Sequence, residues 1–86
     1  MFNFGPFYST DDLRKDALSN IVKLNGNYYY VDSCYTLDHG YETMVFACDS
    51  EGNVTDWSDL YAERYTTRAE MKLGHIETIA NLSELL

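Results

Sequence analysis

The sequence predicts an α+β domain with the element order α-β-β-β-α, a three-stranded antiparallel meander with two helices packed on it. Two observations support this fold class. Apolar residues recur at helical spacing near both ends of the chain, and the spacing changes to two between Tyr28 and Asp49. Because 86 residues make a single small domain, the prediction covers residues 1–86 as one unit.

The N-terminal part is predicted to contain an arm and a helix. Residues 1–8 read as an aromatic arm interrupted by a Gly-Pro pair, with the rings of Phe2, Phe4, Phe7 and Tyr8. Ser9 or Thr10 is expected to cap a helix that begins at Asp11 and stops at Asn25-Gly26. Its apolar stripe consists of Leu13, Ala17, Ile21 and Leu24.

A hairpin is expected between Tyr28 and Asp49, with a two-residue loop on His39-Gly40. This loop pairs Leu37 with Glu42 and Val31 with Cys48. One predicted face is apolar and holds Val31, Tyr35, Leu37, Met44, Phe46 and Cys48. The other holds Tyr30, Asp32, Cys34, Thr36, Thr43 and Asp49. Since this register places the two cysteines on opposite faces, free thiols are expected rather than a disulfide.

The C-terminal half is predicted to hold a third strand and a second helix. After a turn at Ser50–Asn53, the strand runs from Val54 to Tyr65 with a bulge at Ser58-Asp59, and Trp57 joins Phe46 in the core. Thr67 and Glu70 form a capping box. The packed face of the helix is expected to carry Ala69, Leu73, Ile76 and Ile79 or Ala80, with Gly74 permitting close approach to a strand or an aromatic ring.

The net charge of −8 arises in one stretch. Between Asp32 and Glu63 there are eight acidic residues, and no Lys or Arg lies between Leu24 and Glu63. One interpretation is solubility; the other is a recognition surface that imitates the phosphates of a nucleic acid in a basic groove. The candidate partner-binding residues are Asp32, Asp38, Glu42, Asp49, Glu51, Asp56 and Asp59, with Tyr30 and Tyr41 as aromatic anchors.

Other function classes find little support in the sequence. His39 and His75 show no spacing typical of a catalytic triad or a zinc site, and neither cysteine has a basic neighbour, so no enzyme, metal or cofactor is expected. The stretch from Asp49 to Asp56 resembles a calcium loop, but Val54 stands where that loop needs Gly. An acidic surface disfavours direct binding to nucleic acid or to an anionic membrane, and no membrane span is expected.

Several motifs of the C-terminal half resemble a group of small uncharacterised proteins from phages and prophages of Gram-positive bacteria. The shared segments are residues 38–46 (DHGYETMVF), 56–60 (DWSDL), 63–67 (ERYTT), Ala69 and Gly74-His75. In that group, motifs of the form YETMVF, DWSEL, ERYNT and GH recur in this order. The resemblance implies a phage-type origin and a cytoplasmic setting in a host cell.

These observations lead to one hypothesis and one alternative. The hypothesis is a non-enzymatic inhibitor that occupies the basic groove of a host nucleic-acid-handling protein, such as a defence factor. The alternative is a structural or accessory protein that self-associates, for instance as a homodimer, through the aromatic arm of residues 1–8.

Overall fold

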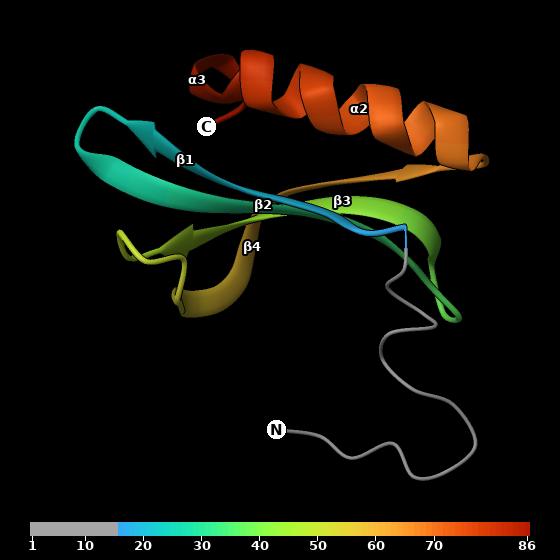
Figure 1. Ribbon diagram of the computed structural model, residues 1–86, viewed down its shortest axis with the longest axis horizontal. Helices are drawn as coiled ribbons and strands as arrows, with labels where there is room; N and C mark the ends of the chain where they lie inside the picture. The colour runs from blue at the N-terminus through green and yellow to red at the C-terminus, as the bar shows by residue number, and fades with distance from the viewer. Residues whose placement is uncertain (1–15) are drawn as a thin grey trace, which may run out of the picture.

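A computed structural model of the chain describes residues 16–86. Four strands, β1 (Leu18–Leu24), β2 (Asn27–Thr36), β3 (Gly40–Cys48) and β4 (Val54–Tyr65), are followed by α2 (Arg68–Ala80) and α3 (Leu82–Leu85). All neighbouring strands are antiparallel, in the order β1-β2-β3-β4. Both helices lie on the same face of the sheet (Figure 1). The described part is therefore β-β-β-β-α, and the predicted order α-β-β-β-α is wrong.

The error lies at β1, which was expected to be helical. Residues 18–24 pair with β2 along their whole length, and Asn25 and Gly26, with φ of 52° and 84°, form the turn between the strands. Asn-Gly with positive φ at both positions is typical of a tight hairpin turn, so it does not end a helix here. The β-branched pair Ile21-Val22 also favours a strand. The start of the predicted helix and the aromatic arm lie outside the described residues.

The β2–β3 hairpin has a different register from the predicted one. Tyr35 pairs with Tyr41 and Val31 with Val45, and residues 37–39 form the connection before Gly40, whose φ is 71°. Val31 was predicted to pair with Cys48, so the register differs by an odd number of residues. Such a difference turns the side chains of one strand to the opposite face relative to those of the other strand. The predicted apolar face is therefore wrong, because the side chains of Met44, Phe46 and Cys48 lie on the other face of the sheet from that of Val31.

The predicted register also placed Cys34 and Cys48 on opposite faces of the sheet, and this placement is wrong for the same reason. With the observed pairs Cys34–Glu42 and Tyr28–Cys48, both thiols lie on one face. Cys34 is opposite Glu42, six residues before Cys48 along β3, so the two thiols are separated by about 20 Å. Both cysteines are free in the structure, as predicted. The reason is their distance along the strands, and not a position on opposite faces of the sheet.

The predicted third strand and its bulge are confirmed in β4. Val45 pairs with Tyr61 and Ala47 with Asp56, so four residues of β4, 57–60, stand against the single residue Phe46. The extra residues curl away from the sheet on the side opposite α2 (Figure 1). Trp57 does contact Phe46, with ring centroids 5.1 Å apart, but its side chain is 72% exposed and the expectation of a core position is wrong.

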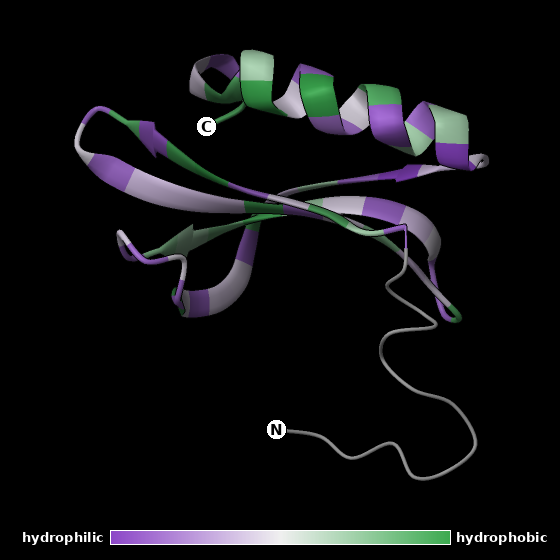
Figure 2. Ribbon diagram, viewed as in Figure 1, coloured by the Kyte–Doolittle hydropathy of each residue, from purple (hydrophilic) through white to green (hydrophobic). Residues whose placement is uncertain are grey.

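Helix α2 covers one face of the sheet. The core beneath it is built on Val31, Val45 and Leu82, packed against Val22, Leu24, Tyr29, Tyr61 and Ile79. The Thr67–Glu70 capping box is confirmed: the Glu70 amide donates to Thr67 Oγ1, and Thr67 N–H donates to Glu70 Oε1. Hydrophobic and polar residues alternate along α2 and the central strands (Figure 2), so hydropathy alone does not mark the packed side of the helix.

The packed face of α2 differs from the predicted stripe. Met71, Gly74, His75 and Thr78 are buried, whereas Ala69, Leu73 and Ile76 of the predicted stripe face solvent. Only Ile79 of that stripe packs against the core, as predicted. Close approach at Gly74 is confirmed, because a methyl group there would overlap the ring of Tyr65. The backbone of α2 can therefore lie directly against this ring, which selects the small and polar side of the helix for packing.

Candidate functional site

The candidate site is the face of the sheet opposite α2, called the open face below. Within residues 16–86, neither helix lies on it. By strand alternation and the Phe46–Trp57 contact it carries an apolar and aromatic set: Ile21, Tyr28, Tyr30, Met44, Phe46, Trp57 and Leu60. Phe46 is buried, whereas Ile21, Trp57 and Leu60 remain exposed.

The open face is bounded by the turn between β3 and β4. Gly52, with a φ of +88°, packs so closely on Ile21 of β1 that a methyl group at this position would overlap the Ile21 side chain. Since β1 and β3 are separated by β2 in the sheet, this turn must bend across the open face to reach Ile21. The turn and the β4 bulge together flank the aromatic set.

Asp49, a candidate partner-binding residue, has a structural role in this turn. Its carboxylate accepts hydrogen bonds from the amides of Glu51 and Asn53, both at 2.9 Å, and from the Asn53 side chain at 3.1 Å. Hydrogen bonds from Asn53 are the main reason why the pKa of Asp49 lies below its ordinary value. The carboxylate that resembled a calcium ligand therefore binds its own backbone.

Two further candidates, Glu42 and Asp32, are held by neighbouring side chains. Glu42 is 8% exposed and forms an ion pair with Arg64 at 3.3 Å. Asp32 accepts a hydrogen bond from Ser19 Oγ at 3.1 Å, and the hydroxyl of Tyr30 donates to the same Ser19 oxygen. These carboxylates connect strands within the open face.

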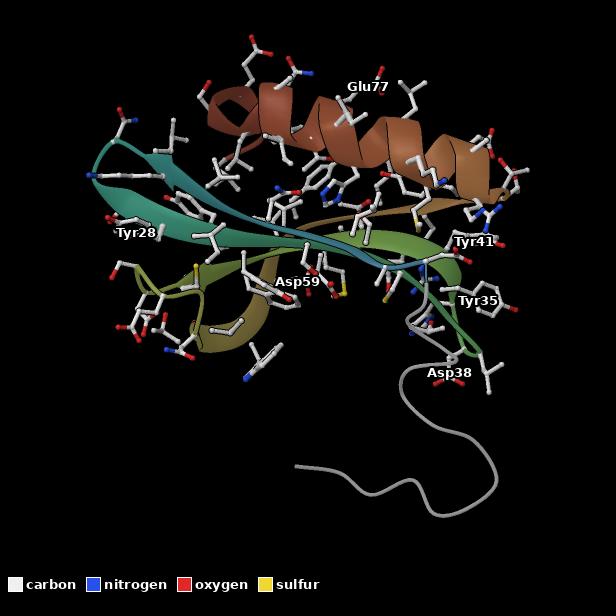
Figure 3. The ribbon with its side chains drawn as sticks, in the orientation of Figure 1. Tyr28, Tyr35, Asp38, Tyr41, Asp59 and Glu77 are labelled. Atoms are coloured by element: carbon white, nitrogen blue, oxygen red, sulfur yellow. The ribbon has the colours of Figure 1, made fainter. Side chains whose placement is uncertain are left out.

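The remaining candidates divide between two regions. Asp38 lies at the β2–β3 hairpin, near Tyr41 and Tyr35, whose rings meet edge to face at 4.9 Å (Figure 3). Phe46 is six residues beyond Gly40 along β3, or about 20 Å away. Glu51 in the β3–β4 turn, Asp56 at the β4 pair before the bulge and Asp59 in the bulge are exposed. Asp59 lies on the side of the sheet away from α2 (Figure 3).

The acidic candidates therefore differ in their surroundings, and Asp38 lies at the opposite end of β3 from the β3–β4 turn. The structure brings Asp56 and Asp59 beside the exposed Trp57, a residue that had been assigned to the core. The Ser58-Asp59 bulge signal does not by itself reveal that Trp57 is exposed, because the length of the bulge depends on pairing with β3.

The face under α2 holds a hydrogen-bond network that sequence reasoning missed. Tyr65 OH donates to Thr43 Oγ1 at 3.1 Å, and Thr43 Oγ1 lies 2.6 Å from Ser33 Oγ. Ser33 Oγ is in turn 2.6 Å from His75 Nδ1, and His75 Nε2 is 2.7 Å from Asn20 Oδ1. Because Asn20 Oδ1 can only accept, the proton of a neutral His75 belongs on Nε2, and Ser33 donates to Nδ1.

The grouping of Ser33, His75 and Asn20 resembles a catalytic triad in residue type, but its serine and histidine are buried. Ser33 is 0% and His75 3% exposed, so no substrate can reach the hydroxyl. Burial lowers the pKa of His75, with the charge of Asp32 acting in the opposite direction. We assign this network to the positioning of α2 on the sheet.

Burial is the main reason why the pKa of the Cys48 thiol is raised, and the charge of Asp49 adds to this shift. The reactive thiolate form of Cys48 is therefore less populated than that of an ordinary cysteine. Among residues 16–86, no cluster of three or more His, Cys, Asp or Glu residues is placed to bind a metal ion. None of the helices in this part of the chain has the length and apolar character needed to span a membrane.

Comparison with known proteins adds no assignment. No protein-family model matches the chain, and neither do any curated protein or any solved structure.

Proposed function

We propose that this protein is a non-enzymatic binding protein that inhibits a nucleic-acid-handling partner by occupying its basic groove. A phage-type origin, suggested by the motifs within residues 38–75, and a host cytoplasmic setting are parts of this proposal. The working surface is the open face at the β4 bulge, with Trp57 as its anchor and Asp56 and Asp59 as its charges.

One observation supports this assignment above the others. Four residues of β4 stand against one residue of β3, and this excess holds Trp57 out of the core with its side chain 72% exposed. Folding alone does not require an exposed Trp, whereas Trp is enriched among the residues that dominate protein interfaces. The contact with Phe46 orients the ring, which lowers the entropy lost on binding.

The charge around Trp57 selects the class of partner. Asp59 lies within the bulge, Asp56 pairs with Ala47 directly before it, and Glu51 lies in the adjoining turn. No Lys or Arg occurs between Leu24 and Glu63. A surface of this sign attracts a basic groove and speeds association with it. Imitation of an extended phosphate ladder is not part of the proposal, because Glu42 is paired with Arg64 and Asp49 accepts hydrogen bonds from its own turn.

The test combines capture with inhibition. The immobilised protein is exposed to a lysate of a Gram-positive bacterium at low and high salt, and a captured protein is then purified. Its binding to a labelled DNA duplex and to a labelled single strand is measured with and without this chain. We expect capture at low salt, release at high salt and competition with the nucleic acid.

Variants separate the proposed surface from general acidity. Trp57→Ala should weaken binding at least tenfold, about 1.4 kcal/mol, as expected for an anchor residue. Asp56→Asn with Asp59→Asn should slow association, whereas the charge-matched pair Asp38→Asn and Glu84→Gln should not. Equal effects of the two pairs, or full binding by the Trp57 variant, would refute the open face as the binding surface.

A further inference from the structure

A second surface lies at the outer edge of β4. This strand is the last in the order β1-β2-β3-β4, so no strand within residues 16–86 pairs with its outer side. In an edge strand, alternate residues direct their N–H and C=O groups outward. Residues 61–65 therefore present a row of backbone donors and acceptors that another extended segment can use.

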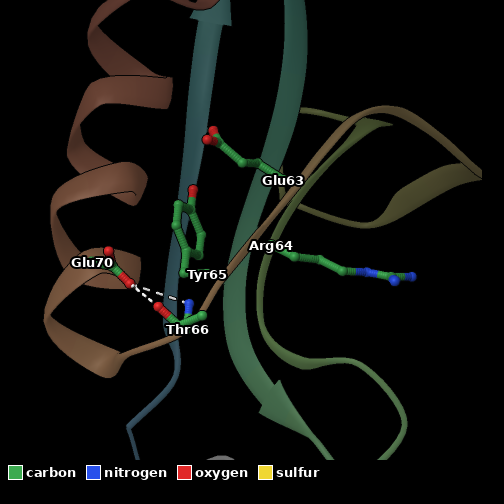
Figure 4. A pocket seen from close by; sticks show the side chains of 5 residues that line it. All are labelled: Glu63, Arg64, Tyr65, Thr66 and Glu70. Atoms are coloured by element: carbon green, nitrogen blue, oxygen red, sulfur yellow. Dashed lines mark hydrogen bonds between the residues drawn. The ribbon is translucent and has the colours of Figure 1, made fainter.

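A groove runs between this edge and α2. Two hollows that share Glu63 form it, with volumes of about 400 Å³ and about 160 Å³. The larger is lined by Glu63, Arg64, Tyr65, Thr66 and Glu70, and the smaller by Tyr61, Glu63, Gly74, Glu77, Thr78, Asn81 and Leu85. Figure 4 shows Glu63 and Tyr65 directed toward the helix side of β4 and Arg64 directed away from it.

The groove is acidic. Glu63 projects from the strand, and Glu70 and Glu77 are two helical turns apart on the side of α2 that lines the hollows. Glu70 Oε1 already accepts hydrogen bonds from Thr66 and Thr67 as part of the helix cap. Glu77 lies on the solvent side of α2 (Figure 3), so it and Glu63 are the carboxylates best placed to meet an incoming cation.

The charge at Glu63 is supported by its neighbour. Tyr61 OH donates to Glu63 Oε1 at 2.7 Å, and this bond is the main reason why the pKa of Tyr61 rises to about 12. The hydroxyl therefore remains protonated and holds the carboxylate in place. The remaining lone pairs of Glu63 can accept hydrogen bonds from a ligand.

We propose that this groove binds an extended basic segment of a partner protein, which adds to β4 as a fifth strand. Backbone hydrogen bonds to residues 61–65 would supply affinity, as in other cases of strand addition. Alternate side chains of the added strand, about 6–7 Å apart, would point toward α2, where Lys or Arg meets Glu63 and, at the solvent-exposed rim of the groove, Glu77.

Charge also argues against a second copy of this chain as the occupant. Antiparallel pairing of two β4 edges through residues 61–65 would bring the Glu63 and Glu77 carboxylates of both copies together, and like charges across strands are destabilising. The proposal is independent of the open face, because the groove lies between the edge of β4 and α2, whereas Trp57 lies on the face of the sheet opposite α2.

The direct test uses a fluorescein-labelled peptide of alternating Arg and Val as the probe. Binding is followed by fluorescence anisotropy, and the amide signals of ¹⁵N-labelled protein are followed by NMR. We expect the largest shifts in residues 61–66 and along α2. Shifts confined to the β4 bulge or to the β2–β3 hairpin would overturn the proposal.

Peptide methylation tests the backbone bonds without altering charge. One peptide is N-methylated at every Arg amide and another at every Val amide, which blocks opposite edges of the added strand. One of the two should lose at least about tenfold in affinity while the other keeps its affinity. Equal binding by both, or equal loss, would contradict strand addition.

Charge-matched variants test the groove. Glu63→Gln with Glu77→Gln should weaken the peptide at least about tenfold, whereas Asp56→Asn with Asp59→Asn should change it by about twofold or less. Equal weakening would mean general attraction to an acidic protein and would refute the site. Trp57→Ala should leave peptide binding unchanged, so failure here and failure of the open-face proposal can be told apart.

Discussion

The two faces of the sheet use polar and aromatic residues in opposite ways. Under α2, the polar side chains of Ser33, Thr43 and His75 are buried, and each has a hydrogen-bond partner. On the open face, the large ring of Trp57 stands in solvent. On the covered face, the polar groups therefore orient a helix. On the open face, apolar area remains that no other part of the described residues covers. This difference is the reason why the proposed function uses the open face, while the buried network is assigned to the positioning of α2.

The largest expected effect tests which side of α2 packs on the sheet. Met71 is 0% exposed, so Met71→Ala should lower the free energy of unfolding by about 2–5 kcal/mol through lost burial and a cavity. Leu73→Ala, two residues away on the solvent side, should change it by about 0.5 kcal/mol or less. Urea unfolding measures both variants. A larger loss for Leu73 would restore the stripe predicted from the sequence.

A second effect tests the buried network. Ser33→Ala removes the group that joins Thr43 to His75 and should lower the free energy of unfolding by about 1–3 kcal/mol, because buried polar atoms are left without partners. Ser19→Ala removes a comparable hydroxyl from the exposed bond to Asp32 and should cost less. If the two variants lose equal stability in urea unfolding, the covered face holds no special role for hydrogen bonding.

The third prediction concerns pH. Because the folded-state pKa of His75 lies below its ordinary value of 6.5, the unfolded chain binds this proton first as pH falls. The contribution of neutral His75 to the free energy of unfolding is therefore fully present above pH 6.5. This contribution declines as the pH falls from 6.5 to the lower pKa of the folded state. His75→Gln should flatten the dependence of unfolding free energy on pH just below 6.5. An unchanged slope in the His75 variant would contradict the assignment.

The smallest effect is expected on the open face. Trp57→Ala loses mainly an edge-to-face contact with Phe46, so the free energy of unfolding should fall by about 1 kcal/mol or less. The same change should strongly reduce binding under the proposed function. Phe46→Ala is the control, since Phe46 is 6% exposed and should cost about 3–5 kcal/mol. Similar losses from both would mean that Trp57 serves the core.

Prediction from the sequence succeeded where the signal was local. The Thr67–Glu70 capping box depends on two residues three positions apart, and it is present. Likewise, the turn at 50–53, the bulged strand that follows it and the close approach at Gly74 could be read from neighbouring residues. The failures are β1, the β2–β3 register and the packed face of α2, and each depends on partners distant in the chain.

The sequence by itself determined the α+β class, the acidic stretch and the capped C-terminal helix, because composition and short-range hydrogen bonds do not need a partner element. Only the tertiary structure decided that residues 18–24 are a strand, since β2 supplies the hydrogen bonds that override an ambiguous apolar spacing. It also decided that His75 and Thr78 face the core, because Ser33 and the Tyr65 ring meet that side of the helix. Finally, pairing with β3 left the excess residues of β4 unpaired and so exposed Trp57, which no local pattern specified.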